Sequence, residues 1–396
     1  MLSNALSLLL SANIASAAIH FVCPTGIDEA AGTLEAPYKS IQLAIDRAAP
    51  GDTIYLREGT YSPTTNIQVK AKSGNASAPI TLSSYNGEKV VIDGEALPHT
   101  PGELGSQIPD TRRGTLHVER SEYWVFYGLE LIHGPYGVYH INSSNILYER
   151  LITHDNYESG VQIQGLSSNN TVLYLDSYRN HDPRKNGESA DGFACKEGSG
   201  EGNLLKGARL WDNVDDGLDL WEFRSAVTIE DTIAWGNGVN RWNFTPFNGD
   251  GNGFKLGGGD EAERAPANHI VRNSIAFANA ARGFIDNKQP GAFLMTRNTA
   301  FNNGEQGFRF LSTNSTLSDN IAALNQNGMS QIEFSPGQVS IGNSWDMPAA
   351  EWSTNASFKS VDSSLVMGPR AADGKIVASD FLLPVSGAEI GATTYW

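Results

Sequence analysis

Cysteine is scarce in this chain of 396 residues, which contains only Cys23 and Cys195. Two cysteines exclude a fold built on a disulfide framework. A Cys23–Cys195 bridge would require an oxidising compartment, and the alternative is that Cys195 is a buried core residue. Basic residues are also few, since 28 Lys and Arg stand against 44 Asp and Glu, a net charge of −16. This balance argues against nucleic acids and anionic membranes as partners.

Long hydrophobic runs are nearly absent. The run from Leu6 to Leu10 precedes Ala15-Ser16-Ala17, a small-x-small cleavage pattern. We therefore predict a secretory signal peptide over residues 1–17, although no Lys or Arg precedes the run, and a buried N-terminal strand is the alternative. No other run approaches the roughly 20 apolar residues of a membrane span, so we expect a soluble, secreted, extracellular protein. Six sequons permit glycosylation: Asn75, Asn142, Asn169, Asn243, Asn314 and Asn355.

A glycine followed by an apolar residue recurs along the second half of the chain. The pairs begin at Gly160, Gly192, Gly217, Gly253, Gly283, Gly307 and Gly328. They lie 21 to 36 residues apart, and several follow an Asn-containing turn. Periods of this length indicate stacked units that close on their neighbours. We predict an all-β fold, a single-stranded right-handed parallel β-helix.

The β-helix is expected to form one domain over residues 18–396, with an irregular C-terminal segment from about residue 336. One amphipathic stretch, Ile41 to Ala48, is predicted to be a short N-terminal helix that caps the first coil. A leucine-rich repeat is disfavoured because regular Leu/Asn repeats are absent. A β-sandwich is disfavoured because sandwiches do not repeat one Gly-apolar corner.

Strand alternation predicts which side chains face outward. After each glycine, the first and third residues are apolar and point into the core, so the residue between them points out. If the coils stack in register, this gives one outward column of Ala194, Asp219, Lys255, Ile285 and Arg309. The residues before the glycines form a second column of Asp191, Asp216, Asn252 and Arg282. Neighbours within a column are expected about 4.8 Å apart.

These columns bring acidic side chains together. Asp191 and Asp216 stack on adjacent coils, with Asp215 and Asp219 beside them. Four such carboxylates repel one another unless one is protonated or a cation joins them. Oxygen ligands without His or Cys select a hard cation, and Ca²⁺ accepts a loose carboxylate cage best. The alternative is a set of solvated turn aspartates, since Asp-Gly is ordinary turn chemistry and no EF-hand spacing is present.

Lys255 is expected one coil beyond Asp219, among glycines that leave room for a polymer. Beside a bound Ca²⁺ the pKa of this lysine would fall, and its neutral amine would act as a base. Metal and base together suggest β-elimination on a uronic acid polymer. Lys196 is the alternative base, expected to turn inward or into a bend. Asp250, Asp260 and Glu261 are expected to be solvated loop charge.

Two arginines and three aromatic residues are further candidates for binding groups. Arg282 and Arg309 lie in the two columns beyond Lys255 and are predicted to pair with uronate carboxylates, or else to be solvated wall residues. The insertion from Val239 to Asp250 carries Trp242, Phe244 and Phe247. Those rings either stack on sugars or pack the insertion against the coil.

Three motifs together resemble polysaccharide lyase family nine. They are Ala190-Asp191-Gly192-Phe193-Ala194, Val214-Asp215-Asp216-Gly217-Leu218-Asp219-Leu220-Trp221 and Gly251-Asn252-Gly253-Phe254-Lys255-Leu256-Gly257-Gly258. Segments from Ala36 to Gln42, Pro50 to Leu56 and Asn298 to Gly304 are also similar to those pectate lyases. The likeness runs from about residue 20 to 335, with Cys195 and Leu218 as departures.

The resemblance implies a right-handed parallel β-helix and calcium-dependent cleavage of polygalacturonate by β-elimination. It places the calcium ligands on Asp191, Asp215, Asp216 and Asp219, and the catalytic lysine on Lys255. The expected partner is therefore an acidic plant cell-wall polysaccharide, bound by a monomer. Other uronate polymers such as rhamnogalacturonan remain alternatives, as does a non-catalytic carbohydrate-binding β-helix. A glycoside hydrolase such as polygalacturonase is disfavoured because Gly-His-Gly and Arg-Ile-Lys segments are missing.

Overall fold

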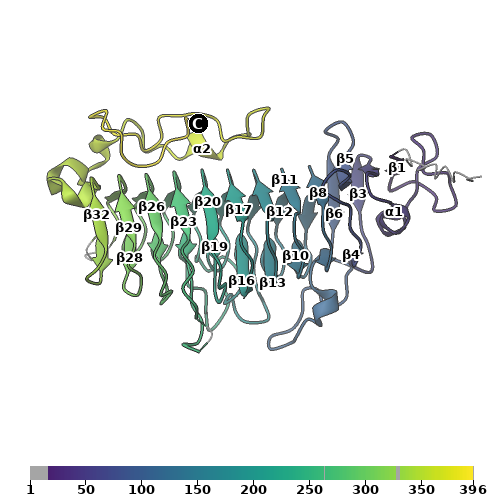
Figure 1. Cartoon of the computed structure of the whole chain (residues 1–396), viewed down its shortest axis with the longest axis horizontal. Helices are drawn as coiled ribbons and strands as arrows, with labels where there is room; N and C mark the ends of the chain where they lie inside the picture. Colours follow the sequence, from purple (N-terminus) through teal and green to yellow (C-terminus); the bar gives the residue numbers. More distant parts are fainter. Residues whose placement is uncertain (1–16, 263, 327–330, 396) are drawn as a thin grey trace, which may run out of the picture.

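The described chain is a stack of coils, ten of which contribute one short strand to each of three parallel sheets, and the first sheet has one further strand at each end (Figure 1). The structure is a computed structural model, and it describes residues 17–262, 264–326 and 331–395. The predicted signal peptide therefore lies outside the described residues apart from Ala17, as does the last predicted repeat pair at Gly328.

Strands of the same sheet come from successive coils, and every pairing between them is parallel. The first sheet contains β1 (Ile19–Val22), β2 (Thr53–Leu56), β5 (Ile80–Ser84), β8 (Trp124–Tyr127), β11 (Leu147–Glu149), β14 (Thr171–Leu173), β17 (Asn203–Lys206), β20 (Val227–Glu230), β23 (Ile270–Arg272), β26 (Leu294–Thr296), β29 (Thr316–Ser318) and β32 (Val339–Ile341). The second sheet contains β4 (Ile67–Lys70), β7 (Leu116–Glu119), β10 (Val138–Ile141), β13 (Val161–Leu166), β16 (Phe193–Ser199), β19 (Leu218–Asp219), β22 (Phe254–Lys255), β25 (Phe284–Ile285), β28 (Phe308–Phe310) and β31 (Ile332–Phe334). The third sheet contains β3 (Gly59–Tyr61), β6 (Val90–Asp93), β9 (Glu130–Ile132), β12 (Ile152–His154), β15 (Asp176–Tyr178), β18 (Arg209–Trp211), β21 (Ile233–Trp235), β24 (Ile275–Phe277), β27 (Thr299–Phe301) and β30 (Ile321–Ala323).

Helices are short and lie outside the coils. The predicted N-terminal helix is α1 (Ile41–Arg47), which begins after the N-cap Ser40 and buries Ile41, Ala44 and Ile45 in the core. It lies at the N-terminal end of the stack (Figure 1). The others are η1 (Asp110–Arg112), η2 (Ser344–Asp346), η3 (Ala349–Trp352), η4 (Asn355–Ser357) and α2 (Ser364–Met367). Among the described residues, neither α-helix is long and apolar enough to cross a bilayer.

The repeated glycines are explained by close contact between coils. A Cβ added to Gly217 would lie 2.7 Å from the carbonyl oxygen of Gly253, and one added to Gly253 would lie 2.8 Å from that of Gly283. Side chains do not fit at such distances, so these positions require glycine. The apolar residues that follow stack in the core, where the Phe254 and Phe284 ring centroids are 4.6 Å apart. Burial of these rings out of water is the main stabilising contribution to the stack.

The predicted Asn-containing turns form a hydrogen-bonded ladder. The side-chain amide of Asn213 donates to Oδ1 of Asn237 (3.0 Å), and Asn237 donates in the same way to Asn279 (2.8 Å). Asn279 continues the ladder to Asn303 at 2.9 Å. Each buried amide is thereby satisfied by the next coil, as buried polar groups require. Both cysteines are free: Cys195 is buried in the core, and Cys23 lies 3.2 Å from the Thr25 hydroxyl.

The irregular C-terminal segment begins after β32 ends at Ile341, slightly later than expected, and runs back along the stack (Figure 1). It covers the outward face of the third sheet, where Trp211, Trp235 and Phe277 stack with centroids 4.9 and 5.5 Å apart. Phe381 from the segment packs edge-on against Phe277 at 5.1 Å. The segment therefore shields a ladder of aromatic rings from water.

A buried ion triad fastens this segment to the middle of the stack. Asp176 accepts hydrogen bonds from Arg209 (2.6 Å) and from Arg370 of the C-terminal segment (2.7 Å).

We expect Asp176→Ala to lower the free energy of unfolding by about 3–5 kcal/mol, because it leaves two buried guanidinium groups without their counter-ion. Thermal or denaturant unfolding measures this. The control is Asp212→Asn, which removes the charge from the more exposed pair with Arg241, keeps a residue suited to the positive φ of this position, and should cost about 1 kcal/mol or less. Equal losses for the two variants would contradict the structural role given to the triad.

Candidate active site

The predicted outward column on the second sheet is confirmed by the strand register. Ala194 pairs with Asp219, Asp219 with Lys255, Lys255 with Ile285, and Ile285 with Arg309. The second column is confirmed by backbone hydrogen bonds. The nitrogen of Gly192 donates to the Asp216 carbonyl, that of Gly217 to Asn252, and that of Gly253 to Arg282. The two columns place the predicted acidic residues and Lys255 on neighbouring coils.

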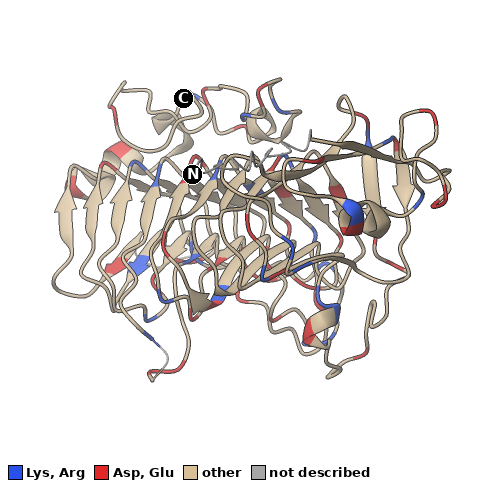
Figure 2. Ribbon diagram, turned by 45° about the vertical axis from the view of Figure 1, so that its right-hand side comes forward, with Lys and Arg blue, Asp and Glu red and all other residues tan. Residues whose placement is uncertain are grey.

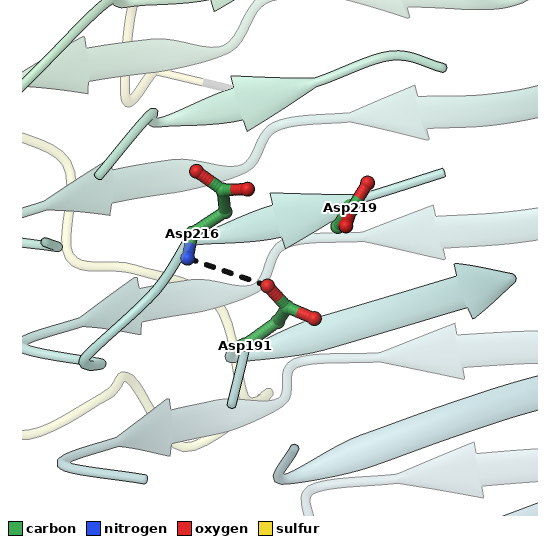
Figure 3. Close-up of side chains that lie close together, drawn as sticks. All are labelled: Asp191, Asp216 and Asp219. Carbon is green, nitrogen blue, oxygen red and sulfur yellow. Dashed lines mark hydrogen bonds between the residues drawn. The ribbon is translucent and has the colours of Figure 1, made fainter. Parts of the chain in front are cut away.

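The aspartates meet as two overlapping groups. Carboxylate oxygens of Asp191, Asp216 and Asp219 all lie within 4.8 Å of one another, as do those of Asp215, Asp216 and Asp250. Figure 3 shows the first group, with the Asp216 nitrogen donating to Oδ1 of Asp191 at 3.3 Å. The four predicted ligands are at most 1% exposed, so they are not solvated turn aspartates.

Part of this carboxylate cluster lacks hydrogen-bond donors. Oδ1 of Asp216 accepts from the backbone and side-chain nitrogens of Asn252, and Oδ1 of Asp215 accepts from the Asp250 nitrogen at 2.6 Å. Oδ2 of Asp215 is buried with no hydrogen-bond partner, and Oδ2 of Asp216 is buried with only an ion pair, to Lys255 at 3.2 Å. Buried oxygens without hydrogen-bond donors in an all-oxygen donor set suit a hard cation, and Ca²⁺ in particular. The residues therefore fit the predicted metal.

Burial shifts the titration of these carboxyl groups. Removal from water raises the pKa of Asp191 to about 6 and that of Asp216 to about 7, and neighbouring carboxylates add to the shift. The pKa of Asp215 is raised well above its usual value for the same two reasons. The cluster thus resists full ionisation near neutral pH, although two positive partners, Lys196 and Lys255, act to lower these pKa values.

Lys255 is one such partner. Its Nζ lies 3.2 Å from Oδ2 of Asp216 and 3.4 Å from Oδ2 of Asp219. It also donates to Oδ2 of Asp250 at 2.8 Å. The expectation that Asp250 is only solvated loop charge is therefore wrong: its carboxylate is 55% exposed but contacts Lys255, because the insertion ends directly beside β22. Burial by itself lowers the pKa of Lys255, but the surrounding carboxylates outweigh it and raise the pKa well above the usual value.

Lys196 is a second positive partner, and the expectation that it turns inward or into a bend is wrong. Its Nζ lies 2.7 Å from Oδ2 of Asp191 and 2.8 Å from Oδ2 of Asp219. The reason is the alternation of side chains along β16. Phe193 and Cys195 point into the core, so the period of two that carries Ala194 outward also carries Lys196 outward. Counting from Phe193 would have given this result from the sequence.

The two arginines lie in the predicted columns but are paired with acids. Arg282 pairs with Glu305, and Nε of Arg309 donates to Oε2 of Glu333 at 2.8 Å. Neither lines the groove described below. Uronate binding by Arg282 and Arg309 stays a prediction with no contact in its favour.

A groove of about 790 Å³ runs over the cluster on the outer side of the second sheet. Loops project from this side of the stack (Figure 1), and residues of these loops, such as Lys185, Asp250 and Lys288, line the groove. Besides Lys255, Lys196, Asp219 and Asp250, its lining includes Arg113, Tyr136, Gln162, Lys185, Trp221 and Lys288. The lining contains five basic residues and five acidic ones, the latter being Glu188, Glu197, Asp219, Asp250 and Asp260, so charges of both signs are mixed in the groove as they are over the chain (Figure 2). Sequence reasoning missed Arg113, Tyr136 and Lys288, because no local pattern says that their loops return to one groove.

Glycines and aromatics near the groove have structural explanations. Trp221 packs against Gly258, where an added Cβ would lie 2.2 Å from Cδ1 of the indole. In the insertion, Trp242 stacks on His181 with centroids 4.7 Å apart, and Phe244 follows at 6.4 Å. These rings pack against the protein, which favours the packing alternative over sugar stacking for the insertion.

Comparison with known proteins identifies the family. Residues 20–327 match the family described as "Pel9A-like, right handed beta helix region". The chain is 61% identical over 392 residues to pectate lyase PEL9 of Emericella nidulans, covering 95% of this chain and 94% of the relative. It is 35% identical to pectate lyase L of Dickeya dadantii, covering 97% and 88% of the two chains.

Solved structures agree with this result. The crystal structure of pectate lyase Pel9A superposes with a TM-score of 0.77 at 30% identity, covering 95% of this chain and 91% of that one. A rhamnogalacturonan lyase superposes with a TM-score of 0.80 at 23% identity, covering 96% and 100% of the two chains, which shows a common fold. The chain belongs to polysaccharide lyase family nine, the Pel9A-like right-handed β-helix proteins, and is a lyase of the pectate lyase type.

Proposed function

We propose that this chain is a secreted, calcium-dependent pectate lyase that cleaves α-1,4-linked polygalacturonate by β-elimination, with Lys255 as the base. The observation that carries the proposal is the position of the Lys255 amine, 3.2 Å from one buried carboxylate and 3.4 Å from another within an oxygen cluster suited to Ca²⁺. The names of the relatives support the substrate, and the pattern of residues 1–17 supports secretion.

Asp191, Asp215, Asp216 and Asp219 are the residues that would hold the cation. Bound there, Ca²⁺ would draw electron density from the uronate carboxylate and acidify the adjacent C5 proton. It would also let an acidic protein bind an acidic polymer. Asp250 is more exposed than the other four and makes a backbone contact to Asp215, so it is an outer member of the cluster.

Lys255 performs the proton transfer. Its neutral amine takes the proton from C5, the C5–H electrons form the C4–C5 double bond, and the C4–O glycosidic bond breaks with its electrons leaving on oxygen. The amine must first lose its own proton. The negative charge of the surrounding carboxylates keeps the amine protonated, because it raises the pKa of Lys255. A cation bound to those carboxylates would neutralise this charge, and burial would then lower the pKa of Lys255.

The remaining groove residues position the polymer. Arg113 donates from Nη1 to the Tyr139 hydroxyl at 3.2 Å, which holds its guanidinium at one part of the groove wall. Lys288 lines another part, beyond β25. Cationic groups at these places suit the uronate carboxylates of a chain lying along the stacked coils.

A chelator experiment tests the metal and the polymer together. We expect polygalacturonate cleavage, followed by the ultraviolet absorbance of the unsaturated product, to stop in excess chelator and to return when Ca²⁺ is restored. Cleavage that continues in chelator would remove the metal role. Reducing ends without the unsaturated product would indicate hydrolysis, and a faster reaction on rhamnogalacturonan would change the substrate.

The raised pKa values predict how stability depends on pH in chelator. Asp191 and Asp216 have a pKa of about 6 and about 7 in the folded protein, against 3.8 as the ordinary value. Between about pH 4 and 7 the folded state therefore binds more protons than the unfolded state, so stability falls as pH rises. We expect Tm in chelator to decrease across this range and Ca²⁺ to restore it at the upper end. A Tm that rises from pH 5 to 7 in chelator, with no response to Ca²⁺, would contradict this.

A further inference from the structure

Lys196 occupies a position between carboxylates that a metal ion would also occupy. Its Nζ lies between two carboxylates from neighbouring coils, 2.7 Å from Oδ2 of Asp191 and 2.8 Å from Oδ2 of Asp219. The side chain is only 12% exposed, whereas most lysine side chains extend into solvent. Both carboxylates belong to the group whose oxygens lie within 4.8 Å of one another.

An ammonium and Ca²⁺ make incompatible demands on these oxygens. Ca²⁺ binds carboxylate oxygens at about 2.3–2.6 Å and needs six to eight oxygen ligands. An ammonium that donates to the same oxygens uses the lone pairs that the ion requires, and the two positive charges repel each other at short range. Lys255 makes longer contacts to the cluster, and its shortest contact is to the outer residue Asp250. Lys196 is thus the lysine bound most closely to two of the inner carboxylates.

The groove offers Lys196 another place. The residue lies outward on β16 and lines the groove together with Gln162 and Glu197. Rotation about the bonds of its flexible stem would carry the ammonium from the carboxylates into the groove without moving the strand.

We propose that Lys196 is an internal cation that competes with calcium for Asp191 and Asp219 and leaves both carboxylates when the ion binds. This inference rests on the proposed function, because it assumes that calcium binds to this cluster. In this role Lys196 does not take part in the chemical step and acts only through the carboxylates that bind calcium. The ammonium stabilises the acidic coils when calcium is scarce and lowers the affinity of the site for the ion.

Substitution of Lys196 by a neutral residue of similar shape tests the competition. We expect Lys196→Met to bind Ca²⁺ about 10-fold more tightly or better by titration calorimetry, because the competing charge is gone. Its Tm in chelator should fall below that of the parent. The control is Lys185→Met, which removes the same charge from the same groove where the ammonium donates to the Ser189 hydroxyl at 2.9 Å. Its calcium affinity should change by less than about 2-fold.

Unchanged or weaker calcium binding by Lys196→Met, beside a parent that binds calcium, would overturn the inference and leave the proposed function intact. If the unmodified protein binds no calcium, both the competition by Lys196 and the proposed calcium-dependent function are wrong. If the variant does not fold, the parent's crystal structure with Ca²⁺ decides. We expect Nζ of Lys196 to lie beyond hydrogen-bond distance of Asp191 and Asp219, and an ammonium still bound to both would reject the competition.

Discussion

Lys255→Ala is expected to lower kcat on polygalacturonate by about 10³-fold or more, at the upper part of the range that a positioned general base contributes. The variant loses the amine that, among the described residues, contacts Asp216, Asp219 and Asp250 together. The fold should persist, because the strand pairing of β22 depends on its backbone. Initial rates of unsaturated product formation measure the loss, and calcium titration should still show binding.

A matched control is Lys206→Ala. Lys206 also pairs with two acids, Glu230 at 2.8 Å and Asp231 at 3.2 Å, but it lies on β17 of the first sheet. This variant should retain nearly all activity. Substantial turnover by Lys255→Ala, combined with an inactive Lys196→Ala, would move the role of base to Lys196. Partial rescue of Lys255→Ala by a small alkylamine would support the assigned role.

Asp216→Asn is expected to weaken calcium binding but to raise the melting temperature in chelator. Asp216 belongs to both carboxylate groups, so the loss of its charge should weaken calcium binding by about 10²–10³-fold, as expected for removing one unit charge next to a divalent ion. In chelator near pH 8, however, the variant should melt at a higher temperature than the parent, because one buried repulsive charge is gone. Asparagine keeps Oδ1, so the hydrogen bonds from Asn252 can remain.

Calorimetry and thermal melting with and without Ca²⁺ measure the two effects. The control is Asp260→Asn, which removes a carboxylate from the groove lining but not from the cluster. It should alter calcium affinity by less than about 2-fold. Asp216→Asn with the calcium affinity of the parent would show that this cluster is not the calcium site.

The sequence predicts this site well where the repeat continues and poorly where it is interrupted. Asp219 and Lys255 could be placed on adjacent strands because each follows a glycine by two residues, which fixes both register and side. Asp250 could not, since it ends an insertion whose path the repeat does not determine. Arg113 and Tyr136 come from loops of earlier coils, and only the folded chain brings them to the groove. The position of Lys196 was available from alternation along β16.

The close glycine contacts also set the dimensions of the carboxylate cluster. Asp191 and Asp216 directly precede Gly192 and Gly217, the positions where neighbouring backbones touch without room for a side chain. The spacing of the backbone that carries these two carboxylates is thus fixed by the scaffold. The glycines set the distance between successive coils. A methyl group added at one of them would therefore change the fit of the carboxylates to the ion, although every ligand would still be present.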